Sequence, residues 1–473
     1  MDPLTFVKTN GEKSNLTNDD IQSLMMNFRG EIHMPADEHY ELHRSVWNGM
    51  IDRKPCIIAR CSGTADVISA VKFARSHNLL ISIRAGGHHV AGRAVCDDGM
   101  VIDLSGMNGV HVDPVKKTAR VQGGATLGDV DHETSAFGLA APLGVVSKTG
   151  VAGLSLHGGY GWLTRKHGLS LDNIISAEVV TADGGLVRAS ADENSDLYWA
   201  IRGGGGNFGI ITSFEFKLHP IDPKVWLLLT FYPLSKAKEG FELIRDAFPD
   251  APEELGLIGV LWNAPLEDFI PEQYRGKPVF VFIGSYTGNL KDGEKVLEPF
   301  RNLGEPIADL SEPLPFKFVQ QVLDPDFPDG RKYYWKSAYV NELDDRLIDL
   351  VIKHAENRPS PLTSIDIWML GGKANRINSE STAFYQRNSP FLVNIESNWD
   401  DPSETDRNVD WTRKAFDEIV KLEDVGTYMN FPGFGEGGKE FFSRSLGSNY
   451  NRLQEVKARY DPDNFFQGFI NLS

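Results

Sequence analysis

The chain has 473 residues, more than one hydrophobic core usually fills, so two or three domains are expected. Hydrophobic residues make up 41% and charged residues 24% of it, as in ordinary globular proteins. The formal net charge of −17 would repel nucleic acid and anionic membranes, so neither is expected as a partner. No apolar run reaches the ~18 residues that span a bilayer, and the polar N-terminus lacks a signal-like apolar stretch. We therefore expect a cytoplasmic protein; the composition indicates no oligomeric state.

Three cysteines, Cys56, Cys61 and Cys96, are too few for a disulfide framework and are expected to be reduced thiols. Cys56 and Cys61 have no histidine partners at zinc-ligand spacing, so they indicate no zinc site.

The first part of the chain predicts a helix followed by short strands. Helical spacing of apolar residues covers 64–80, and the strand-like run LLISIRA (79–85) follows it. Further strand-like runs, separated by turn residues, lie at 100–105, 109–113 and 118–123. Glycine is then dense from 123 to 212, which favours close approach of the backbone to a large ligand over a series of ordinary turns.

The composition changes near Pro220 and Pro223. Beyond them, strand-like runs alternate with longer helical patterns up to about residue 425, which predicts an antiparallel sheet with helices on its other face. The strand-like runs are WLLLTFYPL, KPVFVFIGSY, RKYYWKSAYV, LTSIDIWMLGG and PFLVNIESNW. A last segment contains the helical pattern NRLQEVKARY and ends with YDPDNFFQGFINLS.

The sequence around two motifs excludes the functions that each motif alone would indicate. GGGNFG (204–209) matches the dinucleotide fingerprint, but a helical pattern precedes it and a strand follows it, the reverse of a Rossmann turn. In IRAGGHHVAG (83–92), adjacent His88 and His89 would point in different directions, and no third ligand joins them at suitable spacing. We therefore predict no metal site.

Taken together, several segments resemble the flavoproteins of the vanillyl-alcohol oxidase and para-cresol methylhydroxylase (PCMH) superfamily. They include IRAGGHHVAG, VQGGATLGDV, LGVVSKTGVAGLSLHGGYGWL, DLYWAIRGGGGNFGIITSFEFKL, YMNF and YDPDNFF. The order of these segments is most similar to that of the berberine-bridge-enzyme-like branch. The resemblance implies an α+β fold, in which a PCMH-type FAD-binding domain of two α/β subdomains carries an inserted substrate domain. The implied divisions are 1–221 and 426–473 for the FAD-binding domain and 222–425 for the substrate domain.

The resemblance also implies FAD bound covalently, because the family's histidine after the paired glycines, linked to the flavin 8α-methyl, corresponds to His88. Some members have a second bond from a cysteine, whose position here is Val146, so no cysteinyl bond is expected. The other positions that match the family's cofactor site are Arg84, Ala85, Gly86, Gly87, His89, Gly92, Thr149, Gly150, Gly153, Gly158, Gly159, Gly161, Ile211, Asn430 and Asn464.

Two familiar catalytic positions of the family are altered. Asn394, at the position of the usual base, cannot take a proton at useful pH, and Phe431 replaces a tyrosine. The remaining acid or base candidates are Asp366, Tyr428 and Glu396. Their structural alternatives are that Tyr428 packs on the flavin and that Asp366 caps a loop.

In the run YYWKS, alternation puts Tyr334 and Lys336 on one face and Tyr333, Trp335 and Ser337 on the other. One face is expected to cover the substrate cleft and the other to pack on helices, and the sequence leaves open which is which.

The resemblance implies an FAD-dependent oxidase that transfers a hydride from an alcohol, phenolic or polyketide-like small molecule to FAD and then to O₂. A dehydrogenase using another acceptor, or a flavin-binding protein without turnover, are the alternatives. In the family, the residue at Thr149 borders the space over the flavin's reactive edge, and its small size predicts room for O₂.

Overall fold

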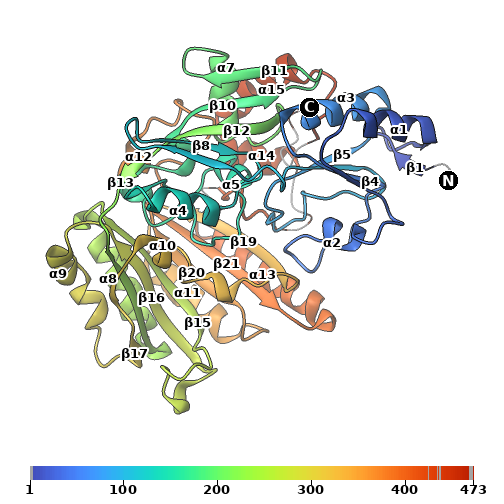
Figure 1. The fold of residues 1–473 in the computed structure, drawn as a ribbon. Coiled ribbons are helices and arrows are strands. Elements are labelled where there is room, and N and C mark those ends of the chain that lie inside the picture. Colours follow the sequence, from blue (N-terminus) through green and yellow to red (C-terminus); the bar gives the residue numbers. More distant parts are fainter. Residues whose placement is uncertain (1–3, 424–425, 434, 436–437, 468–471, 473) are drawn as a thin grey trace.

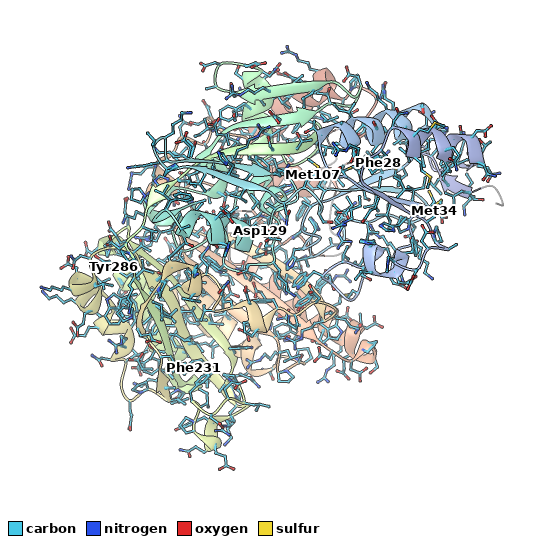
Figure 2. The ribbon with its side chains drawn as sticks, viewed as in Figure 1. Phe28, Met34, Met107, Asp129, Phe231 and Tyr286 are labelled. Atoms are coloured by element: carbon cyan, nitrogen blue, oxygen red, sulfur yellow. The ribbon has the colours of Figure 1, made fainter. Side chains whose placement is uncertain are left out.

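The computed structural model describes residues 4–423, 426–433, 435, 438–467 and 472. It has the predicted α+β fold (Figure 1). One part, called the N-terminal body, contains the strands from β1 (Leu4–Val7) to β13 (His219–Pro220) together with the C-terminal helices α14 (Lys439–Leu446) and α15 (Asn449–Tyr460). The other part is the large sheet, from β14 (Val225–Pro233) to β21 (Phe391–Trp399), with its helices. Figure 2 shows Met107 in the N-terminal body, Phe231 and Tyr286 on the large sheet, and Asp129 where the two parts meet.

The N-terminal body begins with a small sheet whose strands β4, β6 and β5 are parallel. Parallel strands require a crossover connection, which α3 provides between β4 and β5. The buried Val67 and Val71 of α3 pack against the sheet. The strands, in sheet order, are β3 (Glu31–His33), β4 (Ile57–Arg60), β6 (Met100–Asp103) and β5 (Ile81–Arg84). Around them lie β1 (Leu4–Val7), β2 (Lys13–Leu16), α1 (Asn18–Met26), α2 (Tyr40–Arg44) and α3 (Thr64–Ser76).

A second sheet of five antiparallel strands completes this body. In sheet order the strands are β11 (Leu186–Ser190), β10 (Ile174–Val180), β12 (Ile210–Lys217), β8 (Thr118–Gln122) and β7 (Val110–Asp113). The neighbouring elements are α4 (Leu127–Ser135), β9 (Leu139–Ala140), α5 (Val151–Leu156), α6 (Thr164–His167), α7 (Ser195–Ile201) and β13 (His219–Pro220). Because α7 precedes the 204–209 glycines and β12 follows them, rejecting the dinucleotide fingerprint was correct.

The large sheet is antiparallel throughout, as predicted. Its strands are β14 (Val225–Pro233), β15 (Leu255–Asn263), β16 (Pro278–Tyr286), β17 (Ala308–Asp309), β18 (Glu312–Leu314), β19 (Lys332–Val340), β20 (Ser364–Met369) and β21 (Phe391–Trp399). Its helices are α8 (Ala237–Ala247), α9 (Leu290–Arg301), α10 (Phe316–Val319), α11 (Asp345–Glu356), α12 (Lys373–Arg376) and α13 (Thr405–Val420). One face packs apolar side chains such as Ile365, Ile367 and Ile395 against α8, α11 and α13. The opposite face is therefore left for the N-terminal body.

The C-terminal helices α14 (Lys439–Leu446) and α15 (Asn449–Tyr460) return to the N-terminal body (Figure 1). Buried Lys457 of α15 pairs with Asp461 at 2.6 Å and donates to the carbonyl oxygens of Asn207 and Phe466. This ammonium thus joins the end of the chain to the 204–209 glycine loop. The domain divisions at 221 and 425 stay predictions, and the second adjoins residues 424–425, outside the described residues.

A buried ion pair joins the large sheet to the N-terminal body. Arg387, in the β20–β21 connection, makes two 2.7 Å bonds to Asp172 of the 3₁₀ helix Ser170–Asn173. The two side chains are 1% and 4% exposed, so water cannot replace either partner.

Within the described residues, no helix combines the length and apolarity needed to cross a membrane.

Arg387→Met should lower the free energy of unfolding by about 3–5 kcal/mol, because it leaves the Asp172 carboxylate buried without its partner. The matched control is Arg459→Met, which removes the exposed pair with Asp196 and should cost at most about 1 kcal/mol. Chemical denaturation of both variants measures the difference. Equal losses would show that the buried pair does not hold the two parts together.

Candidate active site

A cavity of about 1240 Å³ lies between the N-terminal body and the large sheet. Its wall brings together loops that follow β5 and β9 and side chains from β19, β20 and β21. Of the predicted cofactor residues, the wall includes Ala85, Gly86, Gly87, His88, His89, Thr149, Gly150, Gly153, Ile211, Asn430 and Asn464.

The two glycine loops meet backbone to backbone at Gly86 and Gly150. A Cβ atom on Gly86 would lie 2.4 Å from the Gly150 nitrogen, and a Cβ on Gly150 would lie 2.4 Å from the Gly86 nitrogen. Neither position tolerates a side chain, because the obstructing atoms belong to the backbone. The contact leaves the peptide groups of both loops at the cavity wall.

His88 lies on the cavity wall, with its ring stacked on Trp47 at 5.0 Å between centroids. Burial lowers the pKa of His88 to about 4, so the imidazole is neutral at neutral pH. A neutral imidazole keeps a nitrogen lone pair, which is what a covalent bond to an electrophilic carbon requires.

His89 also lines the cavity, and burial lowers its pKa to about 3. Its Nδ1 accepts the Ala91 N–H at 3.1 Å, so the proton of this neutral ring is on Nε2. The two histidines are therefore held differently, His88 by stacking and His89 by a hydrogen bond within its own loop.

Five predicted cofactor residues are not part of the cavity wall: Arg84, Gly92, Gly158, Gly159 and Gly161. The Arg84 guanidinium donates to the His43 carbonyl oxygen and lies beside Gly87, so it supports the first glycine loop from behind. The assignment of these five residues to the cofactor site stays a prediction, like that of the residues on the wall.

Asp366 projects from β20 into the cavity, on the same face as Trp368, as alternation predicted. One carboxylate oxygen, Oδ2, accepts the Trp368 indole N–H at 2.7 Å and the Asn394 amide at 2.9 Å. The other oxygen, Oδ1, is buried without a hydrogen-bond partner among the described residues. Burial raises the pKa of Asp366 to about 7, although both hydrogen bonds act to lower it.

Glu396 lies next to Asp366 on the same face of the sheet. The register pairs Asp366 with Asn394, and Glu396 is two residues further along β21. Burial, and then the neighbouring Asp366 charge, raise the pKa of Glu396 well above its usual value. Hydrogen bonds from Trp368 and Asn394 favour the ionised form of Asp366, whereas no such donor lowers the pKa of Glu396, so Asp366 is the member of the pair that ionises first.

Tyr428 lines the cavity, but its phenol oxygen is already engaged. It accepts the Gly159 N–H at 2.9 Å and the Asn430 amide at 2.7 Å. Burial raises the pKa of Tyr428 to about 12, so it keeps its proton at neutral pH. These contacts favour a positioning role for Tyr428 and leave the carboxyl pair as the better proton acceptor; its catalytic assignment stays a prediction.

The structure shows which face of β19 lines the cavity, a question that the sequence left open. Trp335 lines the cavity, directly opposite Glu396 in the β19–β21 register. On the other face, the Lys336 ammonium lies 4.0 Å from the centre of the Phe416 ring of α13. The cleft is therefore lined by the Trp335 face.

Thr149 and Val146 both reach the cavity wall. Among the described residues, no acceptor binds the Thr149 hydroxyl. The backbone carbonyl oxygen of Thr149 accepts the Leu127 N–H.

The three cysteines are free and buried, and burial raises the pKa of Cys96, the one on the cavity wall, to about 11.

Sequence reasoning missed Trp47 and Asn48, which precede the first glycine loop. The Asn48 amide donates to the carbonyl oxygens of Val90 and Tyr333, so it joins this loop to β19. Nothing in the local pattern signals this role, because the partners are far away along the chain.

Glu31, His33 and His43 place one ligand atom each within 4.8 Å of one another, which is compatible with a metal ion. The group lies outside the cavity wall, and Glu31 is also paired with Arg60 at 2.8 Å. The group does not include His88 or His89, the pair for which no metal was predicted.

Comparisons with known proteins identify the two segments around this cavity. Residues 55–190 match the family described as FAD binding domain, and residues 427–468 match the family described as Berberine and berberine like.

Similar proteins cover nearly the whole chain. An FAD-linked oxidoreductase of Dictyostelium discoideum is 31% identical over 445 residues, which are 92% of this chain and 93% of that protein. The (R)-6-hydroxynicotine oxidase of Paenarthrobacter nicotinovorans is 28% identical, with 94% and 97% coverage. The crystal structure of the 6-hydroxy-D-nicotine oxidase of Arthrobacter nicotinovorans aligns with a TM-score of 0.84 at 27% identity, over 94% of this chain and 98% of that one.

The cavity fits the cofactor that these families bind. Two loops that meet at Gly86 and Gly150 offer close backbone approach, and Gly206 and Gly209 add further glycines to the same wall. These loops would hold the FAD, with His88 within the first of them.

Gly86→Ala should lower the free energy of unfolding by about 1–3 kcal/mol and reduce the flavin content, because its methyl group would push the two loops apart. Gly63→Ala is the matched control, since a Cβ there meets no atom within 4 Å. Thermal unfolding and the ratio of flavin to protein absorbance measure the two effects. A Gly86→Ala protein with normal flavin content and stability would contradict the importance of the contact.

Proposed function

Because this chain belongs to the FAD-linked oxidoreductases that join an FAD-binding domain to a berberine-like segment, we propose that it oxidises a small organic molecule with O₂ as acceptor. The oxidised compound would be one such as an alcohol, a phenol or a polyketide-like molecule. The relative named for 6-hydroxynicotine supports a small organic substrate. In this proposal residues 1–221 and 426–473 serve the cofactor and 222–425 the substrate.

The observation that carries the proposal is that one cavity contains both the glycine loops with His88 and, on the sheet side, the carboxyl groups of Asp366 and Glu396. When bound, FAD supplies the acceptor for the hydride. The residues of the chain supply the binding surface and the proton chemistry on the other side of the substrate.

Asp366 is the proposed proton acceptor. A general base is most effective when its pKa is near the working pH, and burial brings the pKa of Asp366 to about 7. Its Oδ1 atom is the one without a partner, so the proton of a substrate hydroxyl would move to that atom. Glu396 and Asn394 then have positioning roles, Glu396 as the neighbouring carboxyl group and Asn394 by donating to Oδ2.

The test of the function is a screen of candidate substrates under nitrogen, followed by admission of air. Bleaching of the flavin by a compound supports an oxidoreductase, and recovery of the colour with hydrogen peroxide release supports an oxidase. Bleaching without recovery in air would instead indicate a dehydrogenase, and no bleaching by any compound would count against the proposal.

We expect FAD to be bound covalently through His88 alone. The protein precipitated with acid should stay yellow, and His88→Ala should release its flavin, because the neutral imidazole is the nucleophile on the cavity wall. Peptide mapping should find flavin mass on the peptide of His88 and none on Cys56, Cys61 or Cys96, since Val146 occupies the position of the second bond. A colourless pellet from the unaltered protein would refute the covalent bond.

Thr149→Leu should slow reoxidation of the reduced flavin by O₂ about tenfold or more, a barrier change of ~1.4 kcal/mol. The larger aliphatic side chain would fill space on the cavity wall where Thr149 lies. Anaerobic reduction by substrate should change little. Stopped-flow reoxidation at several oxygen concentrations gives the second-order rate constant, and an unchanged constant would remove Thr149 from the oxygen step.

A further inference from the structure

One connection of the large sheet runs along the cavity wall. Residues 316–331, called the strap, join β18 to β19 and begin with α10, which packs on α4 of the N-terminal body (Figure 1). Side chains of the strap line the cavity, among them Leu323, Pro325 and Phe327. The position of the strap therefore helps to determine the shape of the cavity.

Polar contacts join the strap to residues 144–150, the second of the two glycine loops. The Ser147 N–H donates to the Asp324 carboxylate of the strap at 2.7 Å. The side-chain amide of Gln320 donates to the Gly144 carbonyl oxygen at 3.0 Å. Gln320 is only 2% exposed, so this second contact is made out of reach of solvent. The strap and the glycine loop are therefore held together by buried hydrogen bonds.

Gln320 also bonds Asp131 of α4, and this pair has more acceptors than hydrogens. The Gln320 amide donates to Asp131 Oδ2 at 3.2 Å as well as to Gly144, which uses both of its hydrogens. Asp131 Oδ1 and Gln320 Oε1 are buried without hydrogen-bond partners among the described residues. An ionised carboxylate cannot donate to Gln320 Oε1, whereas a protonated carboxyl group can. One proton on Asp131 would therefore satisfy both atoms.

The surroundings of Asp131 favour the protonated form. Burial raises the pKa of Asp131 to about 7, while the Gln320 hydrogen bond acts to lower it and the charge of Asp324 acts to raise it. Among the described residues, no other charged group on the elements packed around the pair contributes to this shift. These groups are Lys317 of α10, Lys148 of the glycine loop, His111 and Asp113 of β7, and Asp129, His132 and Glu133 of α4 itself.

We propose that Asp131 and Gln320 form a proton-dependent latch that holds the strap against α4 and the second glycine loop. With a proton on Asp131 Oδ1, the carboxyl group donates to Gln320 Oε1 and both side chains are fully bonded. When solvent takes that proton, Gln320 Oε1 lies beside a buried carboxylate, with the charge of Asp324 nearby, and the strap loosens. The latch thereby makes this side of the cavity wall respond to pH.

The latch weakens as the pH rises. In the opened strap the Asp131 carboxyl group is hydrated and has its ordinary pKa of about 3.8, whereas in the closed strap its pKa is about 7. Opening therefore releases a proton at pH values between these two. In that window the equilibrium constant for opening rises by up to about tenfold per pH unit. Above about pH 7 both states are ionised, so the constant levels off.

The test is hydrogen–deuterium exchange of the FAD-containing protein at pH 5 and pH 7.5, with Asp131→Asn as the reference. Asparagine can donate to Gln320 Oε1 and does not titrate, so the exchange rate of the unaltered protein is divided by that of the variant at the same pH. We expect this ratio to rise about tenfold or more from pH 5 to pH 7.5 for peptides of the strap, and to stay constant for peptides of β15 and β16. A strap ratio that is the same at both pH values would overturn the proposal.

A matched variant and a second measurement separate the latch from a general effect of charge. Glu133→Gln removes one negative charge from the exposed side of α4 and should leave the pH dependence of the strap as it is in the unaltered protein. In chemical denaturation, Asp131→Asn should gain stability relative to the unaltered protein as the pH rises from about 4 to 7. A relative stability that does not change with pH, or a Glu133→Gln protein that loses the pH dependence, would refute the latch. Neither measurement needs turnover, so both are independent of the proposed oxidase function.

Discussion

The site depends on the backbone contact between Gly86 and Gly150. The first of these residues follows β5, which is parallel to β6 in the small sheet, and the second precedes α5. Since each would place a Cβ atom 2.4 Å from the nitrogen of the other, the two loops form one surface only if both positions lack side chains. That surface positions His88 and Thr149 on the wall of the same cavity.

A second constraint fixes the distance from this surface to the large sheet. Asn48 bonds the backbone of Val90 on one side and of Tyr333 on the other, and the ring of Trp47 stacks on Tyr333 at 3.7 Å. The Arg387–Asp172 pair joins the two parts at another point. With both parts held, strand register alone determines which side chains face the loops, and it aligns Trp335, Glu396 and Asp366 on that face.

The sequence predicted the elements better than their juxtaposition. Period-two alternation placed Asp366 beside Trp368, and the order of helix, glycines and strand at 204–209 excluded a Rossmann turn. The strand β15 was missed because Gly256 and Gly259 interrupt the apolar run LGLIGVLWN, and glycine is depleted in strands. The roles of Trp47 and Asn48 were not predictable, because their partners are distant along the chain and contact them only in the folded protein. The face of β19 was undecided for a related reason, since both faces of YYWKS are aromatic.

The hydrogen bonds in the cavity explain why Asp366 is a better candidate for the proton acceptor than Tyr428. A tyrosine can act as an acid or base, but the phenol oxygen of Tyr428 already accepts hydrogen bonds from the Gly159 N–H and the Asn430 amide. Asp366 has one occupied oxygen and one unpartnered oxygen, so its side chain is held in place while it remains able to accept a bond. A carboxyl group fixed in this way costs folding free energy, and protein sites of this kind persist where the cost serves binding or catalysis. The burial that raises the pKa of Asp366 is therefore the property that makes this face of the sheet suited to chemistry.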